Sequence, residues 1–408
     1  MDPELPIGII ELGDINIKCV IFKINNNNDS EILSTAITES SGFHNDLIVN
    51  LKKASSTIRS CISEAEKKAK ISLKKINVVF EQPDFLCTRF SKSKKIDGSK
   101  IYKEDIEFLL NEAKKQLILN DKNQSIIHIF NHSYIVDKKT FVEEPIGVYA
   151  DSLTHEMTFI TTKKNNLKNI KQAFIDCDIE VERFISRTFA LGAELLNDKK
   201  LQFGSIIIDL GFEKISFGLF KNLAIIHSMT IPIGINHMTK DISKMCSLDL
   251  EESANIINNV NFLFNKEQYI FDENNYLKDI YFKNSNFRKI SKSLILDVLK
   301  ARSDEIIEKL NKQLILLRFK FSSSVGFALH GGSNLHNIEK YFSNFFGPDL
   351  KILELNNTKK DEDLENNFVV CRGAIKIIKD GWETEAIPEK VDKNIEKTGF
   401  FAKMFKFY

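Results

Sequence analysis

The chain has 408 residues, of which 43% are hydrophobic, and this is enough for two to four domains with their own cores. Its 57 basic and 56 acidic residues leave a net charge of +1, which offers no general attraction to a nucleic acid. The six cysteines are scattered, as expected of buried thiols in a reducing cytosol and not of a metal site. No apolar run has the length of a spanning helix, and no signal peptide is expected.

The N-terminal residues predict a β-rich lobe that begins with a hairpin. An apolar run over residues 7–13 ends in Glu11 and Gly13, and residues 17–24 supply the returning strand. An acid at a strand end can hold a metal ion, and a glycine lets backbone amides approach a phosphate. A third strand, a helix and a fourth strand are predicted to follow over residues 31–37, 46–70 and 76–80.

The next part of the chain departs from this pattern and predicts a compact α+β insertion. Its clearest elements are a helix over residues 101–119 and strands over 125–130 and 152–161, the last with alternating polarity. A helix over residues 167–177 is then expected to return the chain to the first lobe.

Residues 204–242 repeat the arrangement of strand, acid and glycine. An apolar run ends in Asp209 and, two residues later, Gly211, and two more β-rich runs follow. A further predicted strand runs into Gly331 and Gly332, where a helix N-terminus favours contact with a nucleotide. Each signal occurs in many folds, but the three in this order resemble the phosphate hairpins of actin-like ATP-binding proteins.

Beyond residue 242 the chain is predicted to become helical and charged. The clearest helices cover residues 250–258, 291–317 and 367–379. Residues 383–396 are polar, contain a proline and have no apolar period, so they indicate a flexible linker.

The last eleven residues, 398–408, have the pattern of an amphipathic helix. At 100° per residue the apolar side chains fall within an arc of roughly 160°, with the lysines off it. These membrane-binding candidates are Phe400, Phe401, Lys403, Met404, Phe405, Lys406, Phe407 and Tyr408. The pattern favours a helix that lies in a membrane interface, and the alternative is a terminal helix docked on its own domain or on a partner. Because one such tail binds only marginally, stable attachment would need an oligomer.

Several longer blocks of sequence resemble the FtsA family of bacterial division proteins. Residues 231–242 match the family's block after the second phosphate hairpin, and residues 125–137 with 143–161 resemble its inserted subdomain. Residues 368–375 resemble its late connecting helix. The linker and the tail complete the pattern, so the resemblance covers nearly the whole chain.

The resemblance implies an α/β actin-like fold of two lobes with an inserted α+β subdomain and a C-terminal amphipathic helix. The first lobe would comprise residues 1–80 and 163–200 with a return helix near 374–382, the insertion 81–162, the second lobe 201–232 and 319–373, a helical subdomain 233–318, the linker 383–397 and the membrane-targeting helix 398–408.

The resemblance also implies binding of ATP with Mg²⁺, which Glu11 and Asp209 would hold through water. The nucleotide-binding candidates are Glu11, Gly13, Asp14, Asn16, Asp209, Gly211, Lys214, Arg302, Glu305, Gly331, Gly332 and Ser333. Arg302 and Glu305 also fit a surface pair on one helix. The chain departs from the family at Asp14, a carboxylate where a phosphate would lie, and at Phe212 and Glu213, which replace glycines. Hydrolysis is not expected, and no catalytic residue is assigned.

The implied function is a non-enzymatic adaptor at the division site. It would form filaments on the cytoplasmic face of the inner membrane, an anionic surface, tether FtsZ there and recruit later division proteins. The FtsZ C-terminal peptide would bind subdomain 233–318, where the candidate residues are Lys283, Arg288, Lys289 and Lys292. A solvated basic face is the other interpretation of that cluster. The competing functions are a PilM-like scaffold, which lacks such a tail, and a sugar kinase, which needs an intact phosphate loop.

Overall fold

The computed structural model describes residues 5–25, 29–142, 144–197, 201–202, 204–316, 325–327, 335–346, 350–352 and 367–379. These residues form two compact units. The first comprises the described residues among 1–207, 217–230 and 354–408, and the second those among 208–216 and 231–353. The predicted linker over 383–397 and tail over 398–408 lie outside the described residues.

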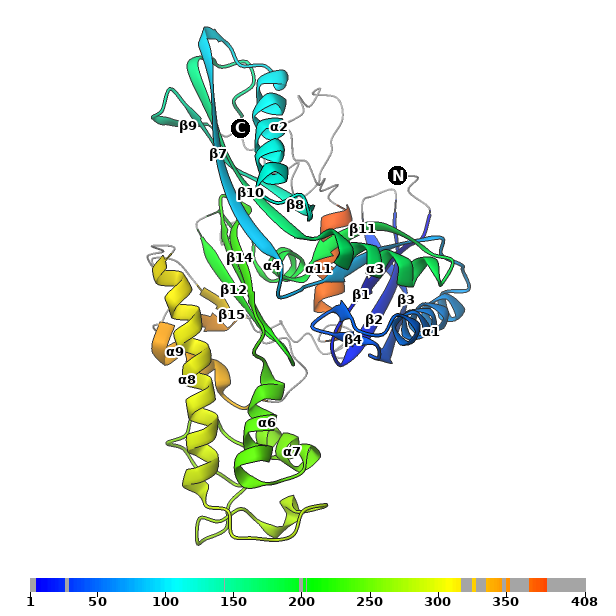
Figure 1. Cartoon of the computed structure of the whole chain (residues 1–408), viewed down its shortest axis with the longest axis vertical. Helices are drawn as coiled ribbons and strands as arrows, with labels where there is room; N and C mark the ends of the chain where they lie inside the picture. Colours follow the sequence, from blue (N-terminus) through cyan, green and yellow to red (C-terminus); the bar gives the residue numbers. More distant parts are fainter. Residues whose placement is uncertain are drawn as a thin grey trace. The chain divides into compact units, whose positions relative to one another are not determined.

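A five-stranded sheet, in the order β11-β6-β1-β2-β3, lies at the centre of the first unit. β1 pairs antiparallel with β2 and parallel with β6, which confirms the predicted N-terminal hairpin. Helices α1 and α3 pack together on one side of this sheet, and α4 and α11 on the other (Figure 1). The bounds are β1 (Ile7–Glu11), β2 (Asn16–Ile24), β3 (Ser30–Glu39), β6 (Lys75–Phe80), β11 (Glu180–Ser186), α1 (Leu51–Ala69), α3 (Lys164–Ile175), α4 (Arg187–Leu195) and α11 (Val369–Lys379).

Helix α1 begins later than the sequence predicts, at Leu51 and not at residue 46. Asn45 and Asp46 adopt left-handed conformations with φ of 53° and 56°. They turn a short hairpin formed by β4 (Phe43–His44) and β5 (Leu47–Ile48). Asn50 then caps α1, because its side chain accepts a hydrogen bond from the Lys53 amide at 3.0 Å. This local turn and cap override the helical spacing upstream of Leu51.

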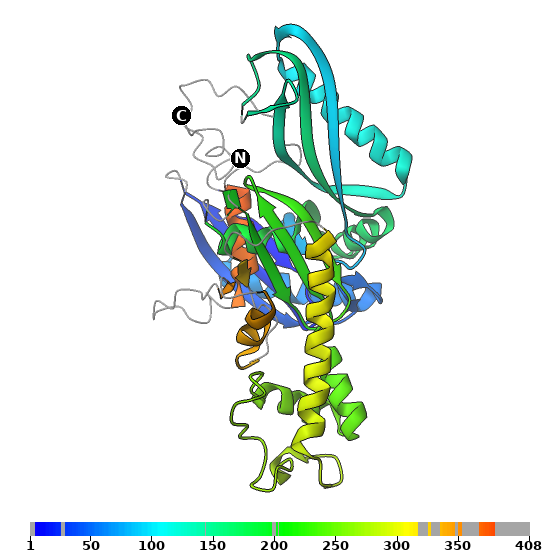
Figure 2. The same ribbon diagram turned by 90° about the vertical axis from the view of Figure 1, so that its left-hand side faces the viewer.

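The predicted α+β insertion is present, with more β structure than the sequence indicates. Four strands in the order β7-β10-β8-β9 form a sheet, and α2 lies along one of its faces (Figure 2). Two clusters of buried apolar side chains join the helix to the sheet. The sequence analysis missed β7, because Lys92 and Lys94 occupy half-buried positions between Phe90 and Ile96 and obscure the apolar alternation. The bounds are β7 (Leu86–Lys100), α2 (Lys103–Asn120), β8 (Gln124–Val136), β9 (Thr140–Val142) and β10 (Tyr149–Lys163).

Helix α11 packs on α4 where only a glycine fits. A Cβ on Gly373 would lie 1.9 Å from the Ala190 carbonyl oxygen of α4. This close approach places α11 against the centre of the first unit, and the return helix expected near 374–382 overlaps the C-terminal part of α11.

The predicted second hairpin is also present, within a three-stranded sheet in the order β12-β13-β14. After this sheet the chain forms the predicted helices α6, α7 and α8 of the second unit, which also contains a short parallel pair formed by β15 and β16. Over the part of the chain that the structure describes, no helix has the length and apolar character needed to span a membrane. The bounds are β12 (Ser205–Leu210), β13 (Ile215–Lys221), β14 (Ala224–Ile231), α6 (Ile235–Cys246), α7 (Leu250–Asn259), η1 (Asp279–Tyr281), α8 (Lys292–Leu316), β15 (Val325–Phe327), α9 (Ile338–Phe346) and β16 (Leu350–Ile352).

Three histidines on β8 and β10 are held neutral by burial. His128 Nε2 accepts a hydrogen bond from the Ser186 amide at 2.8 Å, and the His155 ring stacks on Tyr134 with centroids 4.4 Å apart. Burial lowers the pKa of His128 and of His155 to about 3, and that of His132 to about 4. Each therefore takes up its proton more readily in the unfolded chain than in the fold.

These histidines predict a loss of stability in mild acid. Because the unfolded imidazole has a pKa near 6.5, the loss begins as the pH falls below that value and continues toward the folded pKa values. At about pH 5.5 each histidine should cost about 1.4 kcal/mol of unfolding free energy relative to about pH 7.5.

Urea unfolding at the two pH values measures this effect, and His155→Phe, which keeps a ring against Tyr134, should remove about 1.4 kcal/mol of the pH-dependent loss. The exposed His44 supplies the control variant His44→Phe. An unchanged pH dependence in His155→Phe would contradict the assignment.

Candidate functional site

The two acid–Leu–Gly turns are built alike. A Cβ on Gly13 would lie 2.6 Å from the Asn16 carbonyl oxygen, and a Cβ on Gly211 would lie 2.7 Å from that of Lys214. The Gly211 amide also donates to the Lys214 carbonyl at 3.0 Å. Glycine is thus required in both turns by the close approach of the backbone, and each turn leaves its acid at the end of a buried strand.

In the first turn, the Glu11 carboxylate lies between two cations. It is 3% exposed, and Lys18 Nζ and Arg187 Nε each lie 3.8 Å from its oxygens. Lys18 faces it across the β1–β2 pair. Arg187, the first residue of α4, also donates to the Leu12 carbonyl and lies 3.4 Å from Asp46 Oδ2. The sequence analysis missed Lys18, Arg187 and Asp46 as members of this site.

The other two candidates of the first turn have structural contacts. Asp14 Oδ1 accepts a hydrogen bond from the Asn45 amide at 2.5 Å, which ties the turn to the β4–β5 hairpin. Asn16 opens β2 and is opposite Glu39 of β3.

In the second turn, the backbone carbonyls cap helix α6. The Ile235 amide donates to the Gly211 carbonyl at 3.1 Å, and the Asn236 amide to that of Phe212 at 2.8 Å. The Gly234 amide donates to His237 Nδ1 at 3.1 Å, so His237 serves as a cap. Asp209 and Lys214 are each only 3% exposed.

Glu213, which replaces a family glycine, takes part in this arrangement. The side chain is 7% exposed, and its Oε1 accepts a hydrogen bond from Asn236 Nδ2 at 2.5 Å. Lys240 Nζ lies 3.7 Å from its other oxygen. The carboxylate is therefore bound by the first two turns of α6.

Arg302 and Glu305 form an ion pair on α8, and the same guanidinium reaches α6. Arg302 Nε donates to Asp241 Oδ2 at 2.6 Å, and its Nη2 to Oδ1 at 3.0 Å. The pair that the sequence suggested is thus part of a two-helix brace.

The second turn does not fit an ATP phosphate. The amides that open α6 already donate to protein acceptors, and a carboxylate lies beside them. Gly331, Gly332 and Ser333, the third group of nucleotide candidates, lie outside the described residues.

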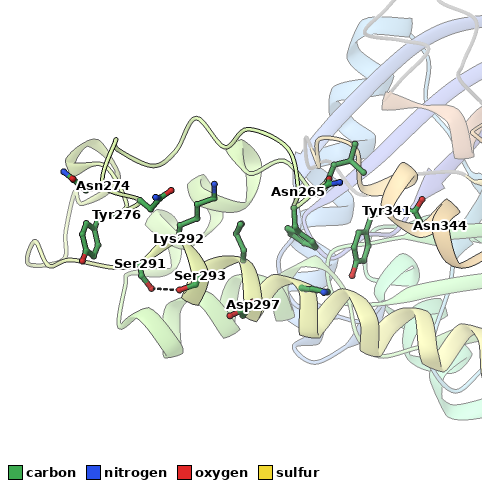
Figure 3. A pocket seen from close by; sticks show the side chains of 14 residues that line it. Asn265, Asn274, Tyr276, Ser291, Lys292, Ser293, Asp297, Tyr341 and Asn344 are labelled. Carbon is green, nitrogen blue, oxygen red and sulfur yellow. Dashed lines mark hydrogen bonds between the residues drawn. The ribbon is translucent and has the colours of Figure 1, made fainter.

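A separate pocket of about 820 Å³ opens in the second unit, between the first turns of α8, the loop before it and α9. Tyr276 and Tyr341 lie toward its opposite ends, and Lys292 projects from the start of α8 (Figure 3). Phe264 meets Tyr341 edge to face, with centroids 5.1 Å apart. The pocket combines aromatic rings, several amides and the cations Lys292 and Lys300.

The structure divides the predicted basic cluster into two pairs. Lys292 lines the pocket, and Lys289 Nζ lies 5.5 Å from the centre of the Tyr276 ring. By contrast, Lys283 Nζ pairs with Glu251 of α7 at 3.4 Å, and Arg288 donates to the Ser247 carbonyl after α6.

Glu252, which the sequence analysis did not single out, holds this loop in place. Its buried carboxylate accepts hydrogen bonds from the amides of Lys283, Asn284 and Ser285 at 2.5, 2.7 and 2.9 Å. Burial alone raises its pKa, but the hydrogen bonds from Ser285, Asn284 and Asp249 outweigh burial and lower the pKa to about 2. The charged carboxylate therefore fixes the segment between the two pairs of basic residues.

Comparison with known proteins identifies the family. The model for the SHS2 domain inserted in FtsA matches residues 86–161, and the model for cell division protein FtsA matches 206–370. The chain belongs to the FtsA family of cell division proteins. FtsA of Buchnera aphidicola subsp. Schizaphis graminum is 25% identical over 339 residues, which is 81% of this chain and 79% of the relative. FtsA of Neisseria meningitidis serogroup B is 23% identical over 250 residues, 61% and 60% of the two chains.

Solved structures confirm the actin-like fold of this FtsA family member. A PilM-PilN type IV pilus biogenesis complex aligns with a TM-score of 0.61 at 11% identity, covering 91% of this chain and 98% of that chain. MreB5 of Spiroplasma citri bound to ADP aligns with a TM-score of 0.52 at 13% identity, covering 92% and 98%. At these identities the likeness establishes the fold alone.

The first turn yields a prediction for Arg187. Replacing it by Met removes a cation that compensates the buried carboxylates of Glu11 and Asp46, so the free energy of unfolding should fall by about 3–5 kcal/mol. Urea unfolding measures this difference. Arg59→Met is the matched control: Arg59 pairs with Asp178 on the surface, and its loss should cost about 0–1 kcal/mol. Equal losses in the two variants would contradict the role of Arg187.

Proposed function

We propose that this chain tethers FtsZ to the cytoplasmic face of the inner membrane at the division site. Its membership of the FtsA family, which includes the inserted subdomain, carries the proposal. The chain acts as an adaptor and not as an enzyme: it assembles into filaments, binds FtsZ through the second unit, binds lipid through the tail and recruits later division proteins.

The pocket beside α8 supports the FtsZ part of the proposal. The C-terminal peptide of FtsZ that the resemblance implies is both acidic and apolar, so its site needs aromatic surface and positive charge. Tyr276 and Tyr341 supply the surface, and Lys292 and Lys289 supply the charge at one end. Such a pocket orients an acidic peptide by charge and holds it by apolar contact.

The amphipathic pattern of residues 398–408 supports the membrane part. Full burial of the five aromatic side chains would yield about 8–15 kcal/mol, but an interfacial helix inserts only shallowly. Ordering eleven residues costs about 1–2 kcal/mol each. A single tail is therefore weak, and attachment depends on many tails presented together.

The two competing functions have less support. The PilM–PilN likeness concerns the fold alone, whereas the family models and the curated relatives are those of FtsA. A sugar kinase needs a loop that admits the phosphates of ATP, and the second turn is already filled by protein groups.

Truncation tests the membrane part. The full chain should sediment with anionic liposomes, with a steep dependence on protein concentration, whereas a chain that ends at Glu396 should stay in solution. A full-length variant with Phe401 and Phe405 changed to Ser keeps both lysines and should also stay in solution. Equal sedimentation of the full and truncated chains would refute membrane binding by the tail.

The split of the basic cluster predicts which lysines matter for FtsZ. The double change Lys289→Gln and Lys292→Gln should weaken binding of a labelled FtsZ C-terminal peptide about tenfold. A higher salt concentration should reduce this difference in affinity between the variant and the wild type. Lys283→Gln is the matched control, because its side chain pairs with Glu251. Fluorescence anisotropy measures both, and a larger effect of Lys283→Gln would place the peptide elsewhere.

A further inference from the structure

The start of α6 shows an unusual use of backbone donors. The first amides of a helix have no partner within the helix, and nucleotide-binding folds use such amides to hold phosphate. Here the Ile235 and Asn236 amides donate to the carbonyls of Gly211 and Phe212, and the Gly234 amide donates to His237 Nδ1. The second turn and the helix therefore satisfy each other.

The side chains at the same place supply an anion. The buried Glu213 carboxylate accepts a hydrogen bond from Asn236 Nδ2 and lies 3.7 Å from Lys240 Nζ. A negative charge at the N-terminal end of a helix is stabilised by the helix dipole. The charge, the hydrogen-bond donor and the cation that a phosphate would use are thus already engaged within the chain.

We propose that Glu213 is a built-in anion that takes the place of a nucleotide phosphate in the second turn. It holds the turn on α6 without ATP, and its charge repels a phosphate from the same place. This inference is independent of the tethering proposed above, because it concerns only residues 209–216 and 234–240 of the second unit.

Loss of the Glu213 carboxylate should open the same place to a small anion. If the carboxylate is removed, Asn236 Nδ2 and Lys240 Nζ lose their shared acceptor and become able to hold a small oxyanion. The variant Glu213→Ala should then be less stable than the wild type but newly sensitive to phosphate, whereas the wild type should be insensitive.

The experiment is thermal unfolding of the full chain, followed by circular dichroism, with and without about 10 mM inorganic phosphate at constant ionic strength. Without phosphate, Glu213→Ala should melt about 2–4 °C below the wild type, and phosphate should recover at least half of that loss. Glu251→Ala is the matched control, because it frees Lys283 on the surface as Glu213→Ala frees Lys240. It corrects for the general stabilisation of folded proteins by phosphate.

A second measurement titrates wild type with about 1 mM Mg·ATP by calorimetry, and no heat of binding is expected. If Glu213→Ala does not fold, Glu213→Gln replaces it, since glutamine keeps the oxygen that accepts from Asn236 and loses only the charge. Binding of Mg·ATP to the wild type would overturn the inference. So would an equal response to phosphate in the Glu213 variant and in Glu251→Ala.

Discussion

The burial of one carboxylate, that of Glu11, organises the first unit. A buried charge is expensive unless partners compensate it, and the β1–β2 turn places this one at 3% exposure. Lys18 comes from the neighbouring strand, but Arg187 must come from the start of α4, and Arg187 in turn brings Asp46 from the β4–β5 turn. The position of α4 matters further, because α11 packs on it through Gly373. The ion pairs of the first turn thus help to fix the position of α11, the last described helix.

The second turn also contains a buried carboxylate that needs compensating partners, and here the partners come from a much shorter stretch of chain. Its carbonyls cap α6, and the buried Glu213 carboxylate, two residues after Gly211, is bound by the same helix. Arg302 then links α6 to α8 through Asp241. The two turns therefore bury their carboxylates in different ways: Glu11 relies on a cation from the start of α4, and Glu213 relies on residues of the adjacent helix. Of the two residues that replace the family's loop glycines, Glu213 contacts the adjacent helix through its side chain and Phe212 through its backbone carbonyl.

Local sequence patterns predicted the helices and strands, but they could not predict contacts between residues that are far apart in the sequence. The hairpins, α2 and α8 followed from periods of 2 and 3.6 residues, whereas β7 escaped because its lysines break the apolar alternation. Arg187 and Asp46 are 141 positions apart, and Glu252 binds the Lys283 amide across 31 positions, so no spacing rule finds them. The basic cluster was visible in the sequence. Its division between Tyr276 and α7 was not, because Glu252 sets the path of the backbone between the two pairs.

Membrane attachment of the proposed adaptor would depend on the number of tails presented together more than on the affinity of one tail. In this proposal a single tail of eleven residues gains little net binding energy, so one subunit would exchange between membrane and solution. Tethering two or more tails converts later binding events into intramolecular ones, and attachment then rises steeply with assembly. In this proposal, an FtsZ polymer that presents many C-terminal peptides would supply this assembly. If Glu213 keeps the second turn closed without nucleotide, attachment needs no ATP-driven change in that turn, and the density of FtsZ peptides becomes the quantity that sets when the chain is on the membrane.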